Sequence, residues 1–397
     1  MTRKSHVKIQ VIVFTLVSVS FASVYITQPV LPVLAAEFST DMIMVSFTVS
    51  AVILGIAISN IPFGFLADRL PIRPIILTGG ILTAAGGAVC AVTGSIWVLI
   101  GARFFQGIFI PALTTCLAAY LSKTLPSDRL NIVMGSYVSA TVRGGLGGRL
   151  LGGWIHKPLH WRYAFITASA LILGATIMAV IGLPRVSREK AQLRNDFHIM
   201  QFVRNWDYLR IYFCAAGSFF IFSSVFNYLP FRLAGEPFNF TTDMTTLFYL
   251  VYVVGIFMGT ASGRISHRFG NGLSMVMGCA VLFLSLALLL VPSVVSVIMG
   301  LLCLCGGFFT VHAAAIGSLN IRLSRGQGQG NALYTLFYYL GGWIGISSSG
   351  FAYRYGGWPL LVCLCGMVLI IPLSASYGEL KKGKVIHLQP GHSGRDG

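Results

Sequence analysis

An arginine lies near the middle of a long apolar segment of this sequence. Arg143 falls within residues 130–155, which could span a membrane and contain no acidic residue. A guanidinium at bilayer depth is costly, so it normally faces a water-filled space or polar partners and indicates a functional site. We predict that Arg143 contacts a substrate. The alternative is a buried hydrogen-bond donor that serves only helix packing.

Two neighbouring features define the faces of this segment. Ser136, Ser139 and Arg143 have the i, i+3, i+7 spacing of a polar stripe, which we expect to face a central substrate path. Arg149 follows six residues later, about 120° away around a helix, so the two arginines are expected on different faces. The glycines recur every four residues and should form a packing groove for another helix; they are Gly144, Gly148 and Gly152.

Other polar and aromatic side chains lie inside apolar segments and are candidate substrate contacts. The alternative for each is packing or anchoring at the membrane interface. Only His312 among the histidines lies well inside such a segment, and its charge can change between pH 5 and 8. The remaining candidates are Tyr25, Gln28, Asn227, Tyr228, Tyr334 and Tyr338.

The placement of acidic residues restricts the chemistry. None of the 11 Asp and Glu residues falls in the middle of an apolar segment. Organic cations are usually bound by a buried carboxylate, so the sequence favours an anionic or neutral polar substrate. The sequence contains no G-x-x-x-x-G-K-[ST] loop and no arrangement of residues with catalytic or metal-ligand spacing. We expect no enzyme activity, no cofactor, and transport driven by a gradient.

The composition indicates a membrane protein. The 397 residues are 55% hydrophobic and only 10% charged, whereas soluble domains are typically about 25% charged. Apolar segments long enough to cross a bilayer as helices recur along the chain. The expected twelve spans are residues 9–34, 43–66, 75–94, 96–121, 131–155, 163–183, 208–230, 244–263, 273–291, 294–318, 331–352 and 358–377.

The formal charge of +17 follows the membrane topology. If the N-terminus is cytoplasmic, almost all basic residues lie on that side, which is the positive-inside pattern. The opposite loops then hold only Lys157, Arg162, Arg232 and Arg354. We therefore expect both termini in the cytoplasm, and basic residues that contact anionic lipid headgroups and not nucleic acid.

A polar interval divides the spans into six and six. The expected units are a first bundle over residues 1–183, a linker over 184–206, a second bundle over 207–380 and a tail over 381–397. The segment from Gly64 to Arg73 is echoed by Gly259 to Arg268, about 195 residues later. Such a repeat indicates two duplicated halves with a binding site between them.

The chain resembles the major facilitator superfamily across all twelve spans. Residues 64–73, Gly-Phe-Leu-Ala-Asp-Arg-Leu-Pro-Ile-Arg, are similar to the family's loop between helices 2 and 3. Pro71 and Ile72 replace a usual glycine and a usual basic residue. The resemblance implies a gating role at the inner helix ends for Asp68, Arg69 and Arg73, with Arg264 and Arg268 in the second half. The alternative is a plain turn with topological arginines.

Three further segments resemble the efflux branch of this family. Arg103 lies in Arg-Phe-Phe-Gln-Gly, which implies coupling or gating, the alternative being a side chain that reaches outward to the membrane surface. Arg149 lies in Gly-Gly-Arg-Leu-Leu-Gly-Gly and is assigned to the same coupling group. The segment from Tyr25 to Pro32 is similar to a stretch of sugar and drug exporters.

The expected protein is therefore an all-α transporter of the bacterial inner membrane. It moves a small solute by alternating access, with proton-coupled export of an anionic or polar metabolite or drug as the first hypothesis. Uptake or exchange of an organic or inorganic anion is the alternative, and a membrane sensor that transports nothing is the second. The expected partners are the small-molecule substrate, protons and membrane lipids, and the protein is expected to act as a monomer.

Overall fold

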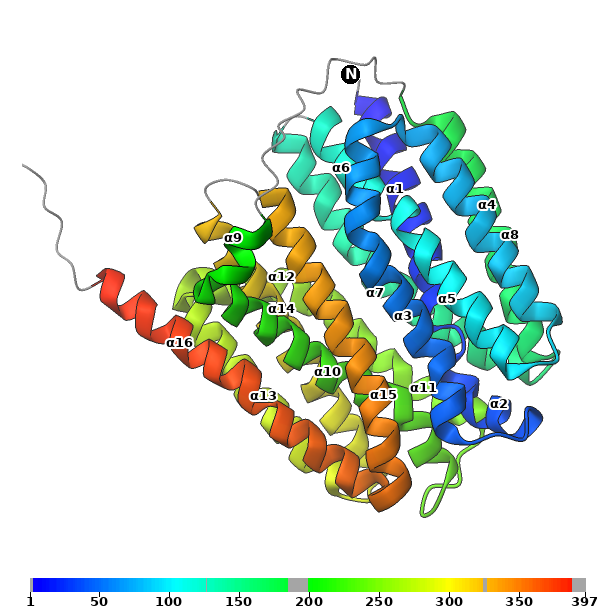
Figure 1. Ribbon diagram of the computed structural model, residues 1–397. Helices are drawn as coiled ribbons and strands as arrows, with labels where there is room; N and C mark the ends of the chain where they lie inside the picture. Colours follow the sequence, from blue (N-terminus) through cyan, green and yellow to red (C-terminus); the bar gives the residue numbers. More distant parts are fainter. Residues whose placement is uncertain (1–2, 126, 185–198, 324–326, 388–397) are drawn as a thin grey trace, which may run out of the picture.

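The computed structural model describes residues 3–125, 127–184, 199–323 and 327–387. The described chain is almost entirely helical, and its helices form two groups that follow each other in the sequence (Figure 1). Most of the predicted linker, and the last ten residues of the predicted tail, lie outside the described residues.

The first half contains helices α1 to α8. Two of its spans are interrupted at prolines: Pro29 lies where α1 gives way to η1 and α2, and Pro111 lies shortly before α5 gives way to α6. Proline removes a backbone donor and so favours such breaks. The elements are α1 (Arg3–Tyr25), η1 (Gln28–Val30), α2 (Leu31–Glu37), α3 (Met42–Arg69), α4 (Ile72–Val92), α5 (Ile96–Leu113), α6 (Thr115–Thr124), α7 (Ser127–His156) and α8 (Trp161–Gly182).

The second half begins after the short helix α9 (Ile199–Arg204). Its second span is built from three pieces, α11, η2 and α12. The elements are α10 (Trp206–Ala234), α11 (Thr242–Leu247), η2 (Phe248–Tyr252), α12 (Val253–Phe269), α13 (Asn271–Leu290), α14 (Val294–Arg322), α15 (Gln327–Val368) and α16 (Ile370–His387). Gly356 and Gly357 are non-helical inside α15, and Gly357 has a φ of 62°, so this helix holds one span and the start of the next.

The expectation of twelve spans in two pseudo-equivalent halves is confirmed. Among the described residues, 9 helical segments are long and apolar enough to cross a membrane. The last of these, Gly328–Lys382, contains two spans that meet at Gly356 and Gly357. The remaining two spans are α7, which carries Arg143 and Arg149, and the interrupted segment from α11 to α12.

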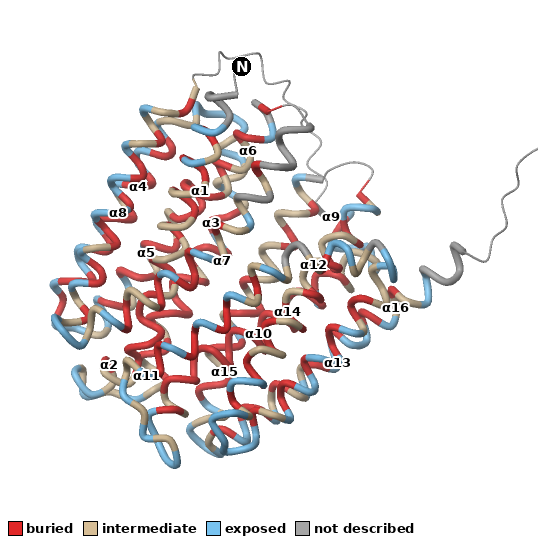
Figure 2. Tube along the Cα trace, turned by 180° about the vertical axis from the view of Figure 1, so that it is seen from behind, coloured by how far each residue is buried: buried red, intermediate tan, exposed pale blue. Residues whose placement is uncertain are grey.

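The two halves meet at the end of the molecule that carries α2 and α11, here called the α2–α11 end. They diverge toward the opposite end, where α1 begins, here called the terminal end (Figure 1). Helix α3 packs against α15, and α7 packs against α11, η2 and α12. Buried residues are concentrated where these helices meet. Along the peripheral helices α4, α8, α13 and α16, buried and exposed residues alternate (Figure 2).

Candidate functional site

A buried arginine lies between the two halves. Arg149 of α7 is only 1% exposed. Its Nε donates to Gln28 Oε1 at 2.6 Å and its Nη1 to the Gly145 carbonyl at 2.7 Å. Its Cζ lies 4.0 Å from the centre of the Tyr25 ring, in the same half, and 4.1 Å from that of Tyr252, in the other half. The guanidinium is therefore a cation held between aromatic rings of both halves.

Two more rings of the second half complete this environment. The Arg149 Cζ lies 5.4 Å from the Tyr249 ring centre and 5.8 Å from that of Phe226. Tyr249 donates from its hydroxyl to the Phe226 carbonyl at 3.2 Å, so these residues are fixed to each other. Aromatic faces stabilise a cation most strongly where water is excluded. We call Tyr25, Gln28, Arg149, Tyr249, Tyr252 and Phe226 the arginine cluster.

Glycines of α7 determine where Arg149 lies. An added Cβ at Gly144 or Gly148 would lie 2.2 or 2.0 Å from the carbonyl oxygen of Ser18 or Ala22 in α1, and one at Gly152 would lie 1.9 Å from that of Ile26, just after α1. The two backbones are thus in direct contact along this face, and α1 is the helix that occupies the groove. Because α1 ends at Tyr25, this contact brings Tyr25 and Gln28 against Arg149.

Arg143 has a different environment. Its side chain is exposed, and its Cζ lies 5.3 Å from the centre of the Phe14 ring on α1. Ser139, one turn earlier, is half-buried, and the side chain of Ser136 lies outside the described part. The structure thus separates the two arginines of α7: Arg149 lies at the interface between halves, and Arg143 does not join that cluster. Substrate contact by Arg143 stays a prediction.

The predicted aromatic residues of the second half lie together. His312 Nδ1 is 3.0 Å from the Tyr334 hydroxyl, and its ring centre is 5.0 Å from that of Tyr338. Tyr338 stacks on Phe219 with ring centres 3.9 Å apart. His312 and Tyr338 are half-buried, whereas Tyr334 is buried. Phe308 stacks on His312 with ring centres 5.7 Å apart and on Phe222 at 4.0 Å, and Phe222 lies 5.4 Å from the Tyr252 ring, so aromatic contacts link this group to the arginine cluster.

Asn227 and Tyr228 are both fully buried and have different partners. Asn227 Nδ2 donates to Ser46 Oγ of α3 at 2.9 Å, so it joins the halves. The Tyr228 hydroxyl donates to the Ile346 carbonyl of α15 at 2.9 Å, within the second half. Asn227 is therefore an interface residue, and Tyr228 fixes α10 to α15.

Arg103 is fully buried inside the first half. Its guanidinium donates to the Thr48 carbonyl at 2.9 Å, the Ser23 carbonyl at 2.8 Å and Gln106 Oε1 at 2.7 Å, and also to the Val24 carbonyl. The side chain does not reach outward to the membrane surface, so that alternative is wrong. Its contacts join α5 to α1 and α3. Coupling or gating by Arg103 stays a prediction.

The residues predicted to gate the terminal end are mostly exposed. Asp68 and Arg69 lie at the end of α3, and Arg264 and Arg268 on α12 are exposed in the same way. Arg268 Cζ lies 5.4 Å from the Phe269 ring centre. Arg73 donates to the Leu183 carbonyl, a contact within the first half. Gating by these residues stays a prediction.

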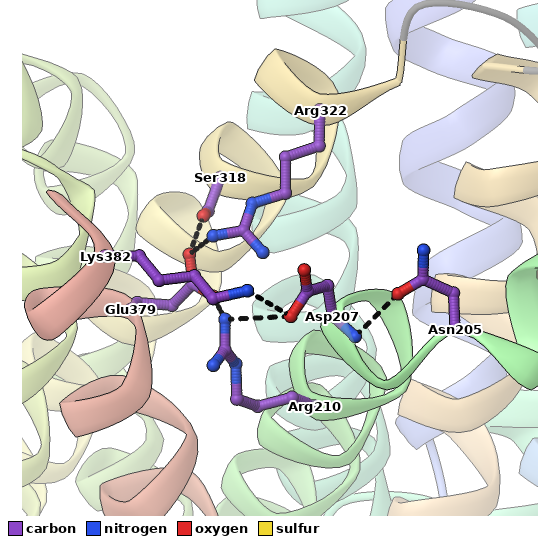
Figure 3. Close-up of polar contacts among 7 residues, drawn as sticks. All are labelled: Asn205, Asp207, Arg210, Ser318, Arg322, Glu379 and Lys382. Carbon is purple, nitrogen blue, oxygen red and sulfur yellow. Dashed lines mark hydrogen bonds and ion pairs between the residues drawn. The ribbon is translucent and has the colours of Figure 1, made fainter. Parts of the chain in front are cut away.

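The second half carries a charge cluster toward the terminal end (Figure 3). Glu379 of α16 is 5% exposed and accepts from Arg210 of α10 and from Arg322 and Ser318 of α14, with Arg322 Nη2 at 2.5 Å. Asp207 pairs with Lys382 and lies 3.8 Å from Arg210 Nη2. These contacts all join helices of one half. Because two arginines hold Glu379, we interpret it as a structural carboxylate.

The sequence pattern did not identify three members of the arginine cluster as candidate site residues. Tyr249 and Tyr252 lie three residues apart in a predicted span, and Phe226 directly precedes Asn227, which was a candidate. A spacing of three on an apolar helix was the available signal. It does not distinguish packing from a cation contact until the opposite helix is known.

Two pseudo-equivalent halves of six membrane spans, with a polar site between them, are the arrangement of an alternating-access carrier. The family model described as Major Facilitator Superfamily matches residues 13–346. The chain belongs to this family and is an MFS-type transporter.

Similar proteins agree with this class. The inner membrane transport protein YnfM of Escherichia coli K12 is 26% identical over 358 residues, covering 89% of this chain and 86% of YnfM. An uncharacterised MFS-type transporter of Bacillus subtilis, YybF, is 26% identical and covers 89% of both chains. The fold is similar to that of a bacterial homologue of the human lysosomal transporter Spinster in an inward-facing, occupied conformation, with a TM-score of 0.73, 14% identity and coverage of 97% and 94%.

Proposed function

We propose that the protein exports a small anionic or polar metabolite or drug across the bacterial inner membrane in exchange for protons. The observation that carries this proposal is Arg149, a buried guanidinium at the interface of the two halves. A site between the halves is the part of a carrier that is exposed to each side in turn.

The charge of the interface supports an anionic or polar substrate. Arg149 with its aromatic rings, and the Asn227–Ser46 hydrogen bond, lie between the halves toward the α2–α11 end. The buried carboxylate of Glu379 lies about midway along α16, beyond the expected end of the last span at residue 377, and is already paired with two arginines. A cationic substrate would therefore meet a like charge with no compensating carboxylate from these residues, which is unfavourable.

The direction of export rests on sequence features. The positive-inside pattern supports an orientation with the terminal end in the cytoplasm and the α2–α11 end outside. The glycine-rich part of α7 and the segment from Tyr25 to Pro32 resemble the efflux branch. His312 is our candidate proton carrier, because an imidazole can accept and release a proton and its Nδ1 lies 3.0 Å from the Tyr334 hydroxyl.

A flux assay with two matched arginine variants tests this proposal. Purified protein in proteoliposomes is screened for counterflow of labelled organic anions, amides and amines. For an anion that the wild type exchanges, Arg149→Gln should reduce flux by at least about tenfold, because the variant loses the positive charge that would bind the anion and a hydrogen bond to a charged group contributes about 1.5–3 kcal/mol. Arg143→Gln tests the other arginine of the same helix, which the sequence predicts to contact the substrate. Equal losses of flux in both variants would contradict the assignment of the substrate charge to Arg149.

The direction requires a separate measurement. The protein is reconstituted in vesicles of known orientation, and a pH gradient is imposed that is acidic on the side of the α2–α11 end. Protons moving down this gradient should drive the anion the opposite way, from the side of the terminal end to the side of the α2–α11 end. Net accumulation together with inward protons would reject export and favour uptake. If the wild type exchanges no member of the panel, the sensor hypothesis gains support.

A further inference from the structure

Two ion pairs join the halves at the α2–α11 end. Lys157 Nζ, just after α7, lies 2.8 Å from Asp243 Oδ2 in the first turn of α11. Arg354 Nη1 of α15 lies 3.2 Å from Asp41 Oδ2, at the start of α3. The first pair places its base in the first half, and the second pair places its base in the second half. The pairs therefore cross the interface in opposite directions.

The duplication of the chain relates these two pairs. The separation of 197 residues between Trp161 and Trp358 also separates Lys157 from Arg354. Asp41 caps the helix that begins the second span of its half, and Asp243 lies in the first turn of the helix that begins the corresponding span of the other half. Each half thus provides a base after its fifth span and an acid at the start of its second span.

The local structure holds these charges in place. Asp41 Oδ1 accepts from the Met44 backbone N–H at 2.8 Å, which leaves Oδ2 for Arg354. A hydrogen bond from Lys157 to Asp243 raises the pKa of Lys157. A raised lysine pKa means that the pair is fully charged below the ordinary lysine value and weakens only as the pH rises through the raised value.

We propose that Asp41, Lys157, Asp243 and Arg354 form a paired-charge latch that favours the conformation in which the halves are joined at the α2–α11 end. Both pairs break in each cycle when this end opens. Rotation of one half against the other separates all four groups, so the pairs exist in one state and bias the equilibrium toward it.

The exposure of the latch suits this role. The side chains of Lys157 and Arg354 are 71% and 57% exposed, and those of Asp243 and Asp41 are 30% and 49% exposed. Surface pairs of this kind change an equilibrium by a factor of about 1.5 to 5 each. Two of them bias the carrier without locking it. The latch requires alternating access but no particular substrate, so it extends beyond the proposed function.

Distance measurements between the halves test the latch. Spin labels are attached at Leu159→Cys and Tyr355→Cys, which are 62% and 79% exposed and lie in different halves, after Cys363→Ser removes an exposed thiol. Double electron–electron resonance in lipid nanodiscs without substrate then reports the populations that are joined and open at the α2–α11 end. The test variant is Lys157→Gln with Arg354→Gln.

The matched control is Lys382→Gln. Lys382 and Asp207 are 46% and 40% exposed and form a pair inside the second half, so their loss should leave the distances unchanged. The double variant should increase the ratio of open to joined molecules by about 2- to 25-fold, the product expected for two exposed pairs. Added salt should produce part of this shift in the wild type but not in the double variant.

A charge exchange gives the decisive comparison. Lys157→Asp alone should open the α2–α11 end, and adding Asp243→Lys should restore the wild-type distribution. Identical distributions in the wild type, the double variant and Lys382→Gln would overturn the latch, as would a failure of the exchanged pair to restore the joined state. Failure of anion transport in the flux assay would leave these distances unaffected, so the two proposals are tested separately.

Discussion

Two buried arginines of the first half have different surroundings and therefore different expected roles. Arg103 donates to carbonyls of α1 and α3 and to Gln106, all within one half. Arg149 contacts rings of both halves. A group that bonds only inside a rigid unit stabilises that unit, whereas a group that bonds across a moving interface changes its contacts during transport.

Replacement of Arg103 by lysine should reduce stability. A lysine ammonium cannot donate to all of the acceptors that the planar guanidinium reaches, and hydrogen bonds to charged groups contribute about 1.5–3 kcal/mol each. We expect Arg103→Lys to lose about 2–3 kcal/mol and to melt at a clearly lower temperature in detergent. Arg264→Lys is the control, because Arg264 is exposed. Equal melting temperatures would contradict the account of Arg103.

The sequence predicted that α7 carries two arginines on different faces, but it did not predict which face meets the second half. Glycines lie on several sides of this helix, so periodicity alone allowed either assignment. The choice depends on α1, whose backbone contacts Gly144 and Gly148 and so turns Arg149 toward Tyr252. Tertiary contacts of this kind are not encoded in the spacing of one segment.

At the scale of helices, the contact between α7 and α1 can be tested by adding a methyl group at either of two adjacent glycines. A Cβ at Gly148 would lie 2.0 Å from the Ala22 carbonyl oxygen, whereas a Cβ at Gly147 meets nothing within 4 Å. Gly148→Ala should therefore destabilise by about 1–3 kcal/mol through overpacking. Gly147→Ala should be neutral or slightly stabilising. Thermal unfolding measures both, and similar melting temperatures for the two variants would refute the close contact.

The charge cluster of the second half fastens α16 to α10 and α14. Glu379 pairs with Arg210 and Arg322, which are 11% and 23% exposed. Removing one partner of a buried ion pair is strongly destabilising, by about 3–5 kcal/mol. Glu379→Gln should therefore lower the melting temperature strongly. Asp207→Asn, at a position that is 40% exposed, should have little effect, and an equally small effect of both would contradict a structural role for Glu379.

The ends of a membrane helix were predictable from the sequence where the length of the apolar segment alone determines them. The expected spans over residues 75–94 and 273–291 correspond to α4, Ile72–Val92, and α13, Asn271–Leu290. The interruptions were harder to predict. The span expected over residues 244–263 is divided into η2 and α12 with α11 before them, and Tyr249 and Tyr252 lie in the tight 3₁₀ turn. This local winding, which places both rings on Arg149, depends on packing against α7.

At the scale of the molecule, the halves are joined at the α2–α11 end by ion pairs, by the Asn227–Ser46 hydrogen bond and by the arginine cluster. All of these contacts must separate when this end opens. The duplicated halves were predictable from the repeat of residues 64–73 at 259–268. The reciprocal ion pairs were not, because loop charges in one sequence do not identify their partners.

The central claim is that the buried guanidinium of Arg149 between the halves selects the substrate by charge. Thermal stabilisation of the purified protein by benzoate, benzamide and benzylamine tests it most directly, because the three have similar size and differ in charge. A ligand that binds the native state raises its apparent stability. We predict a concentration-dependent rise in melting temperature with benzoate that Arg149→Gln abolishes. Stabilisation by benzylamine alone would contradict the claim.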